Sequence, residues 1–505
     1  MRTLVLARML AATAMVLAAP LAAQPIADGP RIPLYSSDSE KGLAPVLAAA
    51  PDGGFAAVWT RQGDLLARVF RADGAALTPV ATLISPDDGF DFGHGFPKIA
   101  ALSTGGYAVA WTRGGPLDQL AGRLRILDAT GQPAGPVLEL GSSEHPWEQV
   151  FVDSITADAT GHFVVGWSGS GDTVVQRFGA DGTPATPEIM IPTEPSTPEV
   201  AAFPDGRFVV GWMGTERLDF VFHNLLAQLY GPAGNALGLP FAVRATANDR
   251  SVYNLRISAL ADRFATVWTE TFFTTPADRI VARLWDANGL PLGPEIVVAE
   301  TAQSGQSVGG GQVAMRSDGS FLVLWMQEAT PLVRLFDPQG RPVGEPLPIL
   351  VSSGVGASDV EAAGHGWWVA SPVYDLSVGP TPANAPWAQR LVSSCGTVSG
   401  PGLCLGGRFR AEVAWRVPGI AADGIGSPLP QTDDTGAFWF FAPGNYELLV
   451  KVLDGRGVNG HYWVFYGALT DVEFDLTVTD LATGKKRTYH NPAGTMASRA
   501  DTVAF

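Results

Sequence analysis

Strand-like stretches that are apolar on both faces recur along most of this chain. The clearest is PDGRFVVGW at 204–212, a turn signal followed by an apolar run that ends on tryptophan. Side chains alternate between the two faces of a strand, so Phe208, Val210 and Trp212 share one face and Val209 lies on the other. Because both faces are apolar, we expect each such strand to be buried between neighbouring layers.

Near-copies of this stretch define seven units. The other copies are PDGGFAAVW (51–59), STGGYAVAW (103–111), ATGHFVVGW (159–167), LADRFATVW (260–268), SDGSFLVLW (317–325) and a degenerate AGHGWWVAS (363–371). The aromatic residues that begin the strands are separated by 52, 56, 45, 56, 57 and 46 residues. Strand-like repeats of this length are typical of propellers or arrays.

The first six units each contain the pattern of four short strands, and the seventh lacks the last one. A short apolar strand precedes each copy, and two more strands with a Gly-rich turn between them follow it. Examples of the first strand are KIAAL (98–102), EVAAF (199–203) and RISAL (256–260). The sequence therefore predicts an all-β fold, a seven-bladed β-propeller over residues 24–394.

The two ends of this region complement each other. The seventh unit ends at WAQRLV (387–392) without a fourth strand, and residues 24–37 supply a turn signal and a short apolar run. We expect residues 31–36 to pair with the last unit and close the ring, which removes the free sheet edges of an open array.

The pattern changes from about residue 395. Alternating segments such as GAFWFFAP (436–443) and HYWVFYGAL (461–469), separated by Gly, Asp and Pro turns, predict a small β-sandwich over 395–505. The chain has two cysteines, Cys395 and Cys404, which we expect to form a disulfide at the junction in an oxidising compartment. The alternative is two free thiols, and a metal site at this pair is weaker still, because no histidine lies nearby in the sequence.

Residues 1–23 are predicted to be a secretory signal peptide. Arg2 and Arg8 precede a short apolar stretch that ends on small residues. No later segment is apolar enough to span a membrane, so we expect a protein that is secreted, periplasmic or on the cell surface.

The formal net charge of −16 disfavours nucleic acid and anionic membranes as partners. Residues 395–505 and the signal peptide are nearly balanced, so the acidic excess lies in residues 24–394. The charge is compatible with an extracellular glycan, peptide or protein as partner, and it also serves solubility.

The candidate binding residues lie in long, irregular loops on one face of the predicted ring. In a four-stranded antiparallel blade, the second–third loops and the crossovers lie on the same face, and variable loops on a rigid scaffold commonly carry binding sites. The centre of the ring on that face is the expected pocket. The candidates are Asp87, Asp88, Asp91, His94, Glu144, His145, Trp147, Glu148, Asp219, His223, Phe272 and Trp387.

These residue types suggest three chemistries, each with a structural alternative. His94, His145 and His223 with nearby carboxylates suit a metal or acid–base cluster, and the alternative is solvated surface loops. The DDGFDFG run suggests calcium but lacks the spacing of an EF-hand, so no cofactor is predicted beyond that weak indication. The aromatic residues, Phe272 and Trp387 among them, would stack on sugar rings or peptide side chains, or instead pack over the blade ends.

Two stretches resemble known bacterial sequences. The D-G-x-F-x-V-x-W strand and the later Q/R-x-F-x-x-x-G turn resemble repeats of large secreted and surface bacterial proteins, which implies export and a propeller-like fold. GAFWFFAP, LTVTDLATG, TYHNPAG and the terminal ADTVAF resemble a domain at the ends of many secreted bacterial proteins. Neither resemblance implies an activity.

The resulting expectation is an exported, non-catalytic binding or scaffold protein that uses the long-loop face of a propeller. The alternative is an extracellular polysaccharide hydrolase or lyase that uses carboxylates of that face, such as Asp88, Glu148 and Asp219. We find no G-x-S-x-G, H-E-x-x-H or Gly-rich phosphate loop in the sequence.

Overall fold

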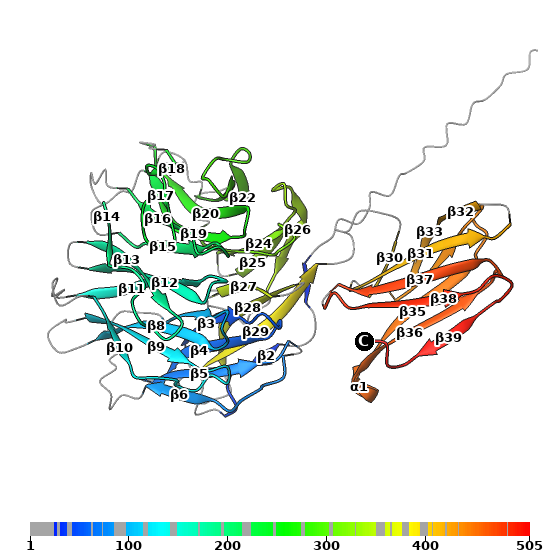
Figure 1. Ribbon diagram of the computed structural model, residues 1–505. Coiled ribbons are helices and arrows are strands. Elements are labelled where there is room, and N and C mark those ends of the chain that lie inside the picture. The colour runs from blue at the N-terminus through cyan, green and yellow to red at the C-terminus, as the bar shows by residue number, and fades with distance from the viewer. Residues whose placement is uncertain are drawn as a thin grey trace, which may run out of the picture.

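The computed structural model describes a protein built almost entirely of antiparallel strands (Figure 1). It describes residues 25–505 except 28–30, 38–42, 62–63, 73, 85–96, 115–119, 142–148, 170–171, 193–195, 215–223, 246–248, 274–277, 302–306, 329, 350–358, 364–365, 376–382, 394–401, 407, 420–421, 433 and 482.

Six sheets of four strands each follow one another along the chain. In every one, the strands are paired in chain order. The first three sheets contain β3 (Leu43–Ala49), β4 (Phe55–Arg61), β5 (Asp64–Phe70) and β6 (Ala81–Ile84); β7 (Lys98–Ala101), β8 (Tyr107–Gly114), β9 (Leu120–Leu127) and β10 (Leu138–Leu140); and β11 (Val150–Ala157), β12 (His162–Gly169), β13 (Thr173–Gly179) and β14 (Ile189–Ile191). The next three contain β15 (Glu199–Ala202), β16 (Phe208–Met213), β17 (Leu225–Tyr230) and β18 (Phe241–Arg244); β19 (Arg250–Ala259), β20 (Arg263–Phe272), β21 (Asp278–Asp286) and β22 (Ile296–Glu300); and β23 (Val308–Met315), β24 (Phe321–Gln327), β25 (Thr330–Phe336) and β26 (Pro342–Pro348).

A further sheet combines both ends of this region. Its strands β27 (Asp359–Ala363), β28 (Gly366–Asp375) and β29 (Ala383–Ser393) are joined by β1 (Pro25–Ala27) and β2 (Ile32–Pro33), which both pair with β29. Leu34 adds a hydrogen bond from its backbone N–H to the Pro386 carbonyl, at 3.1 Å. The predicted pairing of the N-terminal segment with the last unit is thus confirmed.

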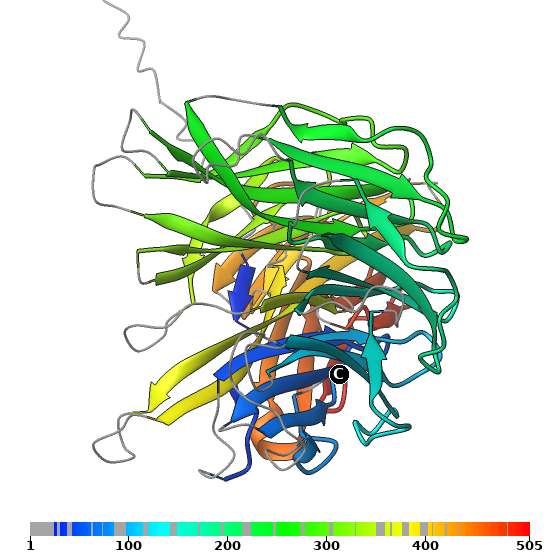
Figure 2. The same cartoon turned by 90° about the vertical axis from the view of Figure 1, so that its left-hand side faces the viewer.

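The first strands of the seven sheets form a closed series of contacts. Each of β3, β7, β11, β15, β19, β23 and β27 contacts the first strand of the next sheet, and β27 contacts β3. Figures 1 and 2 show the sheets following one another around a common centre. This arrangement is consistent with a β-propeller.

The core lies between adjacent sheets. Seven hydrophobic clusters each draw their residues from two neighbouring sheets, and one of them joins the first sheet to the last. The repeat tryptophans are at most 1% exposed and belong to this core, as the alternation predicts: Trp59, Trp111, Trp167, Trp212, Trp268 and Trp325.

An aromatic pair recurs inside the sheets. In five of them, the aromatic residue that opens the second strand stacks on the one that ends the third, as Phe55 does on Phe70 with ring centroids 4.6 Å apart. The other pairs are Phe163–Phe178, Phe208–Tyr230, Phe264–Trp285 and Phe321–Phe336. In these five sheets the pairing gives the aromatic residue before the third–fourth turn a packing role.

The C-terminal residues form two more sheets of five strands, which share one hydrophobic cluster. One contains β30 (Leu403–Leu405), β31 (Phe409–Val417), β32 (Ala422–Ile425), β37 (Glu473–Asp480) and β38 (Lys486–Asn491); the other contains β33 (Ser427–Thr432), β34 (Thr435–Trp439), β35 (Leu448–Gly455), β36 (His461–Ala468) and β39 (Ser498–Asp501). The helix α1 (Arg456–Asn459), absent from the sequence prediction, lies between β35 and β36. Within the described residues, no helix is long and apolar enough to cross a membrane.

Candidate functional site

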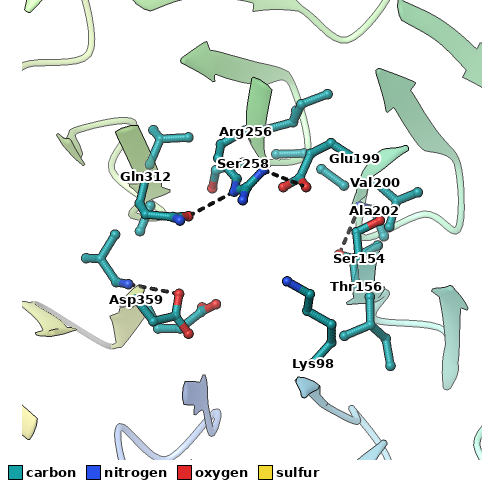
Figure 3. Close-up of a pocket in the computed structure, with 18 of the residues that line it drawn as sticks. Lys98, Ser154, Thr156, Glu199, Val200, Ala202, Arg256, Ser258, Gln312 and Asp359 are labelled. Atoms are coloured by element: carbon teal, nitrogen blue, oxygen red, sulfur yellow. Dashed lines mark hydrogen bonds and ion pairs between the residues drawn. The ribbon is translucent and has the colours of Figure 1, made fainter. Parts of the chain in front are cut away.

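A cavity of about 340 Å³ lies at the centre of the ring, between the first strands (Figure 3). Residues from the first strand of every one of the seven sheets line it. Its polar and charged lining residues include Lys98, Asp153, Ser154, Glu199, Arg256, Gln312, Asp359 and Glu361.

One register position supplies most of this polar lining. The second strand of each sheet carries the repeat tryptophan, which is replaced by Ser371 in the last unit. The residue just before it is paired with a residue of the first strand, and that first-strand residue faces the cavity. The seven residues are Val46, Lys98, Ser154, Glu199, Arg256, Gln312 and Asp359. Six of the seven are polar, so the wall is a ring of side chains of both charges rather than an apolar plug.

The backbone next to this ring is irregular in four of the strands. The pairing register shifts immediately before Val46, Ser154, Arg256 and Gln312. A β-bulge inserts an extra residue and re-aims the neighbouring side chain. In β11 the extra residue is Asp153, which therefore adds a second polar side chain from the same strand to the cavity.

Several cavity residues are held by fixed partners. The Arg256 Nη1 atom lies 3.6 Å from the Glu199 Oε2 atom, and its Nε donates to the Gln312 Oε1 atom at 3.2 Å (Figure 3). The Asp359 carboxylate accepts hydrogen bonds from the backbone N–H groups of Leu47 at 2.7 Å and Val360 at 3.0 Å. Glu199 is thus paired with a cation, whereas Asp359 is bound by backbone donors.

Smaller polar side chains of the wall join adjacent first strands. The Thr156 hydroxyl accepts from the Ala202 backbone N–H at 3.2 Å, and the Ser258 hydroxyl accepts from that of Met315 at 3.0 Å. The Ser154 hydroxyl donates to the Pro198 carbonyl at 2.7 Å. Because each of these three hydroxyls already has a hydrogen-bond partner in the protein, we assign the three side chains a structural role.

Lys98 of the ring and Asp153, which lies next to the ring residue Ser154, each have a polar atom without a hydrogen-bond partner among the described residues. The Lys98 ammonium points into the cavity in Figure 3, and within the described residues it makes no hydrogen bond and no ion pair within 4.0 Å. The Asp153 Oδ2 atom is buried and has no hydrogen-bond partner among those residues. Lys98 thus has unused donors that face the cavity, whereas the unpaired Asp153 Oδ2 atom is buried in the cavity wall.

The cavity shifts the pKa values of its ionisable groups. Burial, partly offset by a hydrogen bond from Ser168 and by Lys98, raises the pKa of Asp153 to about 7. Burial also raises the pKa values of Glu199, Asp359 and Glu361, and the neighbouring Asp359 charge raises that of Glu361 further. Burial and then Arg256 lower the pKa of Lys98, against the nearby carboxylates. Clusters of perturbed groups in a cavity are a feature of functional sites.

Most of the residues proposed from the sequence lie outside the described part of the chain. They are Asp87, Asp88, Asp91, His94, Glu144, His145, Trp147, Glu148, Asp219 and His223, together with the calcium-like run and Cys395. Among the residues that are described, no group of three or more His, Cys, Asp or Glu side chains is arranged to hold a metal ion. Their proposed binding roles and the disulfide remain predictions.

The structure describes the two remaining candidates, Phe272 and Trp387. The Phe272 ring lies at the end of β20, and the guanidinium groups of Arg250 and Arg279 lie 4.0 and 4.9 Å from its centroid. Trp387 is 5% exposed, packs in the core between the sixth and seventh sheets, and carries Arg31 at 4.5 Å from its ring centroid. Trp387 therefore matches the packing alternative, and Phe272 lies outside the central cavity.

Three residues of the charged ring are visible in the sequence, but the strand pattern alone does not show that they line a cavity. The first-strand segments KIAAL, EVAAF and RISAL each begin with a charged residue before an apolar run. Lys98, Glu199 and Arg256 are those residues, and all three line the cavity. Their meaning depends on the first strands lying at the centre of the ring, which is a property of the assembled fold.

Comparisons with known proteins give fold likeness only. No family model matches the sequence, and no curated protein does. Among many similar solved structures are hydrazine synthase from Kuenenia stuttgartiensis (9% identity, TM-score 0.46, 66% of this chain and 94% of that one), polysaccharide lyase Uly1 (10%, 0.43, 73% and 93%) and the Dos1 propeller (11%, 0.38, 72% and 95%). All three identities are 11% or lower, so the likeness concerns the fold alone.

Proposed function

We propose that this protein is an exported, non-catalytic binding protein. In this proposal the seven sheets are the blades of one β-propeller over residues 24–394, and residues 395–505 are an accessory β-sandwich. The ligand is a polar group of an extracellular glycan, peptide or protein, which enters from the long-loop face and binds in the central cavity. The predicted signal peptide supports export.

The observation that carries the proposal is the polar ring of the cavity. An apolar side chain would pack at this register position without cost, as Val46 does, whereas burying charged groups is unfavourable unless they are paired. The raised carboxyl pKa values reflect that cost at Asp153, Glu199 and Asp359. Charged groups that are retained in spite of this cost, with unused donors at Lys98, are suited to recognise a ligand.

The direction of the first strands supports entry from the long-loop face. Strands β7, β15 and β27 begin at Lys98, Glu199 and Asp359, immediately after the crossovers from the preceding sheets. The charged ring therefore lies at the end of the cavity nearest those crossovers, which also form the variable loops.

A glycan and peptide array probed with the mature protein tests this function. We expect selective binding that weakens roughly tenfold or more in R256Q, because Arg256 holds both Glu199 and Gln312 in place. The control is R341Q, at an arginine whose side chain is 75% exposed and pairs with Asp337. Absence of selective binding, or equal loss in both variants, would refute the proposal.

One observation favours a catalytic alternative, a polysaccharide hydrolase or lyase. The pKa of Asp153 near 7 and the lowered pKa of Lys98 are suited to general acid–base catalysis at neutral pH. New reducing ends or unsaturated products from incubated polysaccharides, lost in D153N, would replace the binding proposal with this one.

A further inference from the structure

We propose that the central cavity binds one neutral, polyhydroxylated unit the size of a monosaccharide, with a hydroxyl group seated between Lys98 and Asp153. This inference rests on the proposed function and narrows its ligand class. The hydrogen-bonding capacity, the charge balance and the size of the cavity support it.

Hydrogen-bonding capacity selects a group that both donates and accepts. A lysine ammonium can only donate, and an ionised carboxylate can only accept. Lys98 and Asp153 line the same cavity from adjacent sheets, and among the described residues Lys98 has no hydrogen-bond partner. A single hydroxyl can accept from Lys98 and donate to the Asp153 carboxylate at once.

Charged ligands satisfy this pair less well. A ligand carboxylate would pair with Lys98 but would meet the like charge of Asp153, and a ligand ammonium would do the reverse. The second cation of the ring, Arg256, is already engaged with Glu199 and Gln312. The remaining carboxyl groups of the cavity, Asp359 and Glu361, have pKa values that burial raises, which favours their uncharged forms. We therefore expect a ligand ion of either sign to gain little here.

The size and the rest of the wall limit the ligand to one small unit. A volume of about 340 Å³ is near the lower end of small-molecule sites, which span roughly 300–1,000 Å³. Among the described lining residues none is aromatic, and small apolar residues such as Ala157, Ala201 and Ala259 flank the ring. Recognition would therefore depend on hydroxyl contacts, and any longer glycan would extend toward the long loops.

Isothermal titration calorimetry, in which sugars are titrated into the mature protein at neutral pH, tests the inference. The probes are D-glucose, D-galactose and D-mannose as neutral sugars, D-galacturonate as the anion and D-glucosamine as the cation. We expect one neutral sugar to bind best, and K98M and D153N each to weaken its binding roughly tenfold to a hundredfold. The matched control D181N, an exposed turn residue of the same sheet as Asp153, should bind like the wild type.

A second measurement needs no variant and covers the case in which K98M or D153N fails to fold. The wild-type protein is treated with formaldehyde and a reducing agent, with and without the sugar, and methylation of Lys98 is read by mass spectrometry. We expect the neutral sugar to protect Lys98 and to leave Lys486 of the C-terminal region reactive.

Each outcome decides between the inference and the broader function. Preferred binding of galacturonate or glucosamine that depends on Lys98 or Asp153 would overturn the neutral-ligand inference and leave the binding function standing. Neutral sugars that neither bind nor protect Lys98 would also overturn the inference, whereas the array with R256Q judges the function by itself. Neutral-sugar binding unchanged in K98M and D153N would overturn the assignment to this cavity.

Discussion

Asp153 faces the cavity because β11 contains one residue more than its partner strand requires. The register shift between Val152 and Ser154 leaves Asp153 as the extra residue, and Ser154 then occupies the ring position. The bulge thus adds a titratable group to the cavity without removing the hydroxyl that bonds to Pro198. Bulges near functional sites commonly re-aim a side chain in this way.

The raised pKa of Asp153 predicts a pH-dependent stability difference. Its pKa is about 7 in the folded protein against 3.8 for the ordinary group, so the folded state binds the proton more tightly. Ionising Asp153 therefore destabilises the fold as pH rises from about 4 to about 7. We expect the melting temperature of D153N, relative to the wild type, to be higher at pH 8 than at pH 5.

D181N is the control for this pH effect. Hydrogen bonds from Thr183 lower the pKa of Asp181 below its ordinary value of 3.8. Asp181 is therefore ionised in both the folded and the unfolded protein at pH 5 and at pH 8, and its contribution to the stability of the fold should be the same at both. A D153N difference that is as flat as that of D181N would show that Asp153 is not protonated in the folded protein near neutrality.

At the scale of one element, the turn between β7 and β8 contains two glycines that are needed for different reasons. Gly105 and Gly106 in STGGY both have positive φ, of 91° and 85°. A Cβ on Gly105 would have nothing within 4 Å, whereas one on Gly106 would lie 2.2 Å from the Leu127 backbone carbonyl oxygen of the third strand. Only the second position is therefore restricted by packing as well as by conformation.

G105A and G106A should consequently differ. G105A carries only the cost of a left-handed alanine, roughly 1–2 kcal/mol. G106A adds displacement of a backbone carbonyl, and overpacking costs about 1–3 kcal/mol more. We expect urea denaturation to give a lower midpoint for G106A than for G105A, and equal midpoints would contradict the close approach to Leu127.

The strands were predictable from the sequence, and the cavity ring was not. The alternation in PDGRFVVGW determines which face each residue takes within a strand, so Phe208 and Trp212 could be placed in the core in advance. Glu199 and Arg256 each begin a short apolar run, where one charged residue commonly marks a solvated strand end. The charged ends of the first strands come together only through contacts between different sheets, such as the Arg256–Glu199 pair. The bulge at Asp153 had no sequence signal.

Over the whole molecule, a second set of contacts links the sheets on the face opposite the ring residues. An arginine of one sheet donates from Nη1 to a backbone carbonyl in the third–fourth turn of the next sheet. The pairs are Arg177–Pro232, Arg207–Ala287, Arg263–Pro338 and, between the last sheet and the first, Arg390–Ala72. The sheets are therefore joined both at the cavity and at the short turns, and the join between the two chain ends uses the same contact as the others.

That join also depends on the N-terminal segment, and Leu34 measures its contribution. Leu34 is 0% exposed and packs in the cluster that unites the first and last sheets, with Phe55, Trp59 and Trp368. Truncating a buried leucine costs about 2–5 kcal/mol, so L34A should lower the denaturation midpoint of the propeller region clearly.

L239A is the control, because Leu239 is 87% exposed and surface changes usually stay within about 0.5 kcal/mol. If L34A denatures like L239A, the N-terminal segment is dispensable and the ring is held by β27, β28 and β29 alone. If L34A instead unfolds in two steps, with the first and last sheets separating before the rest, closure by the N-terminal strand is what makes the seven sheets one cooperative unit.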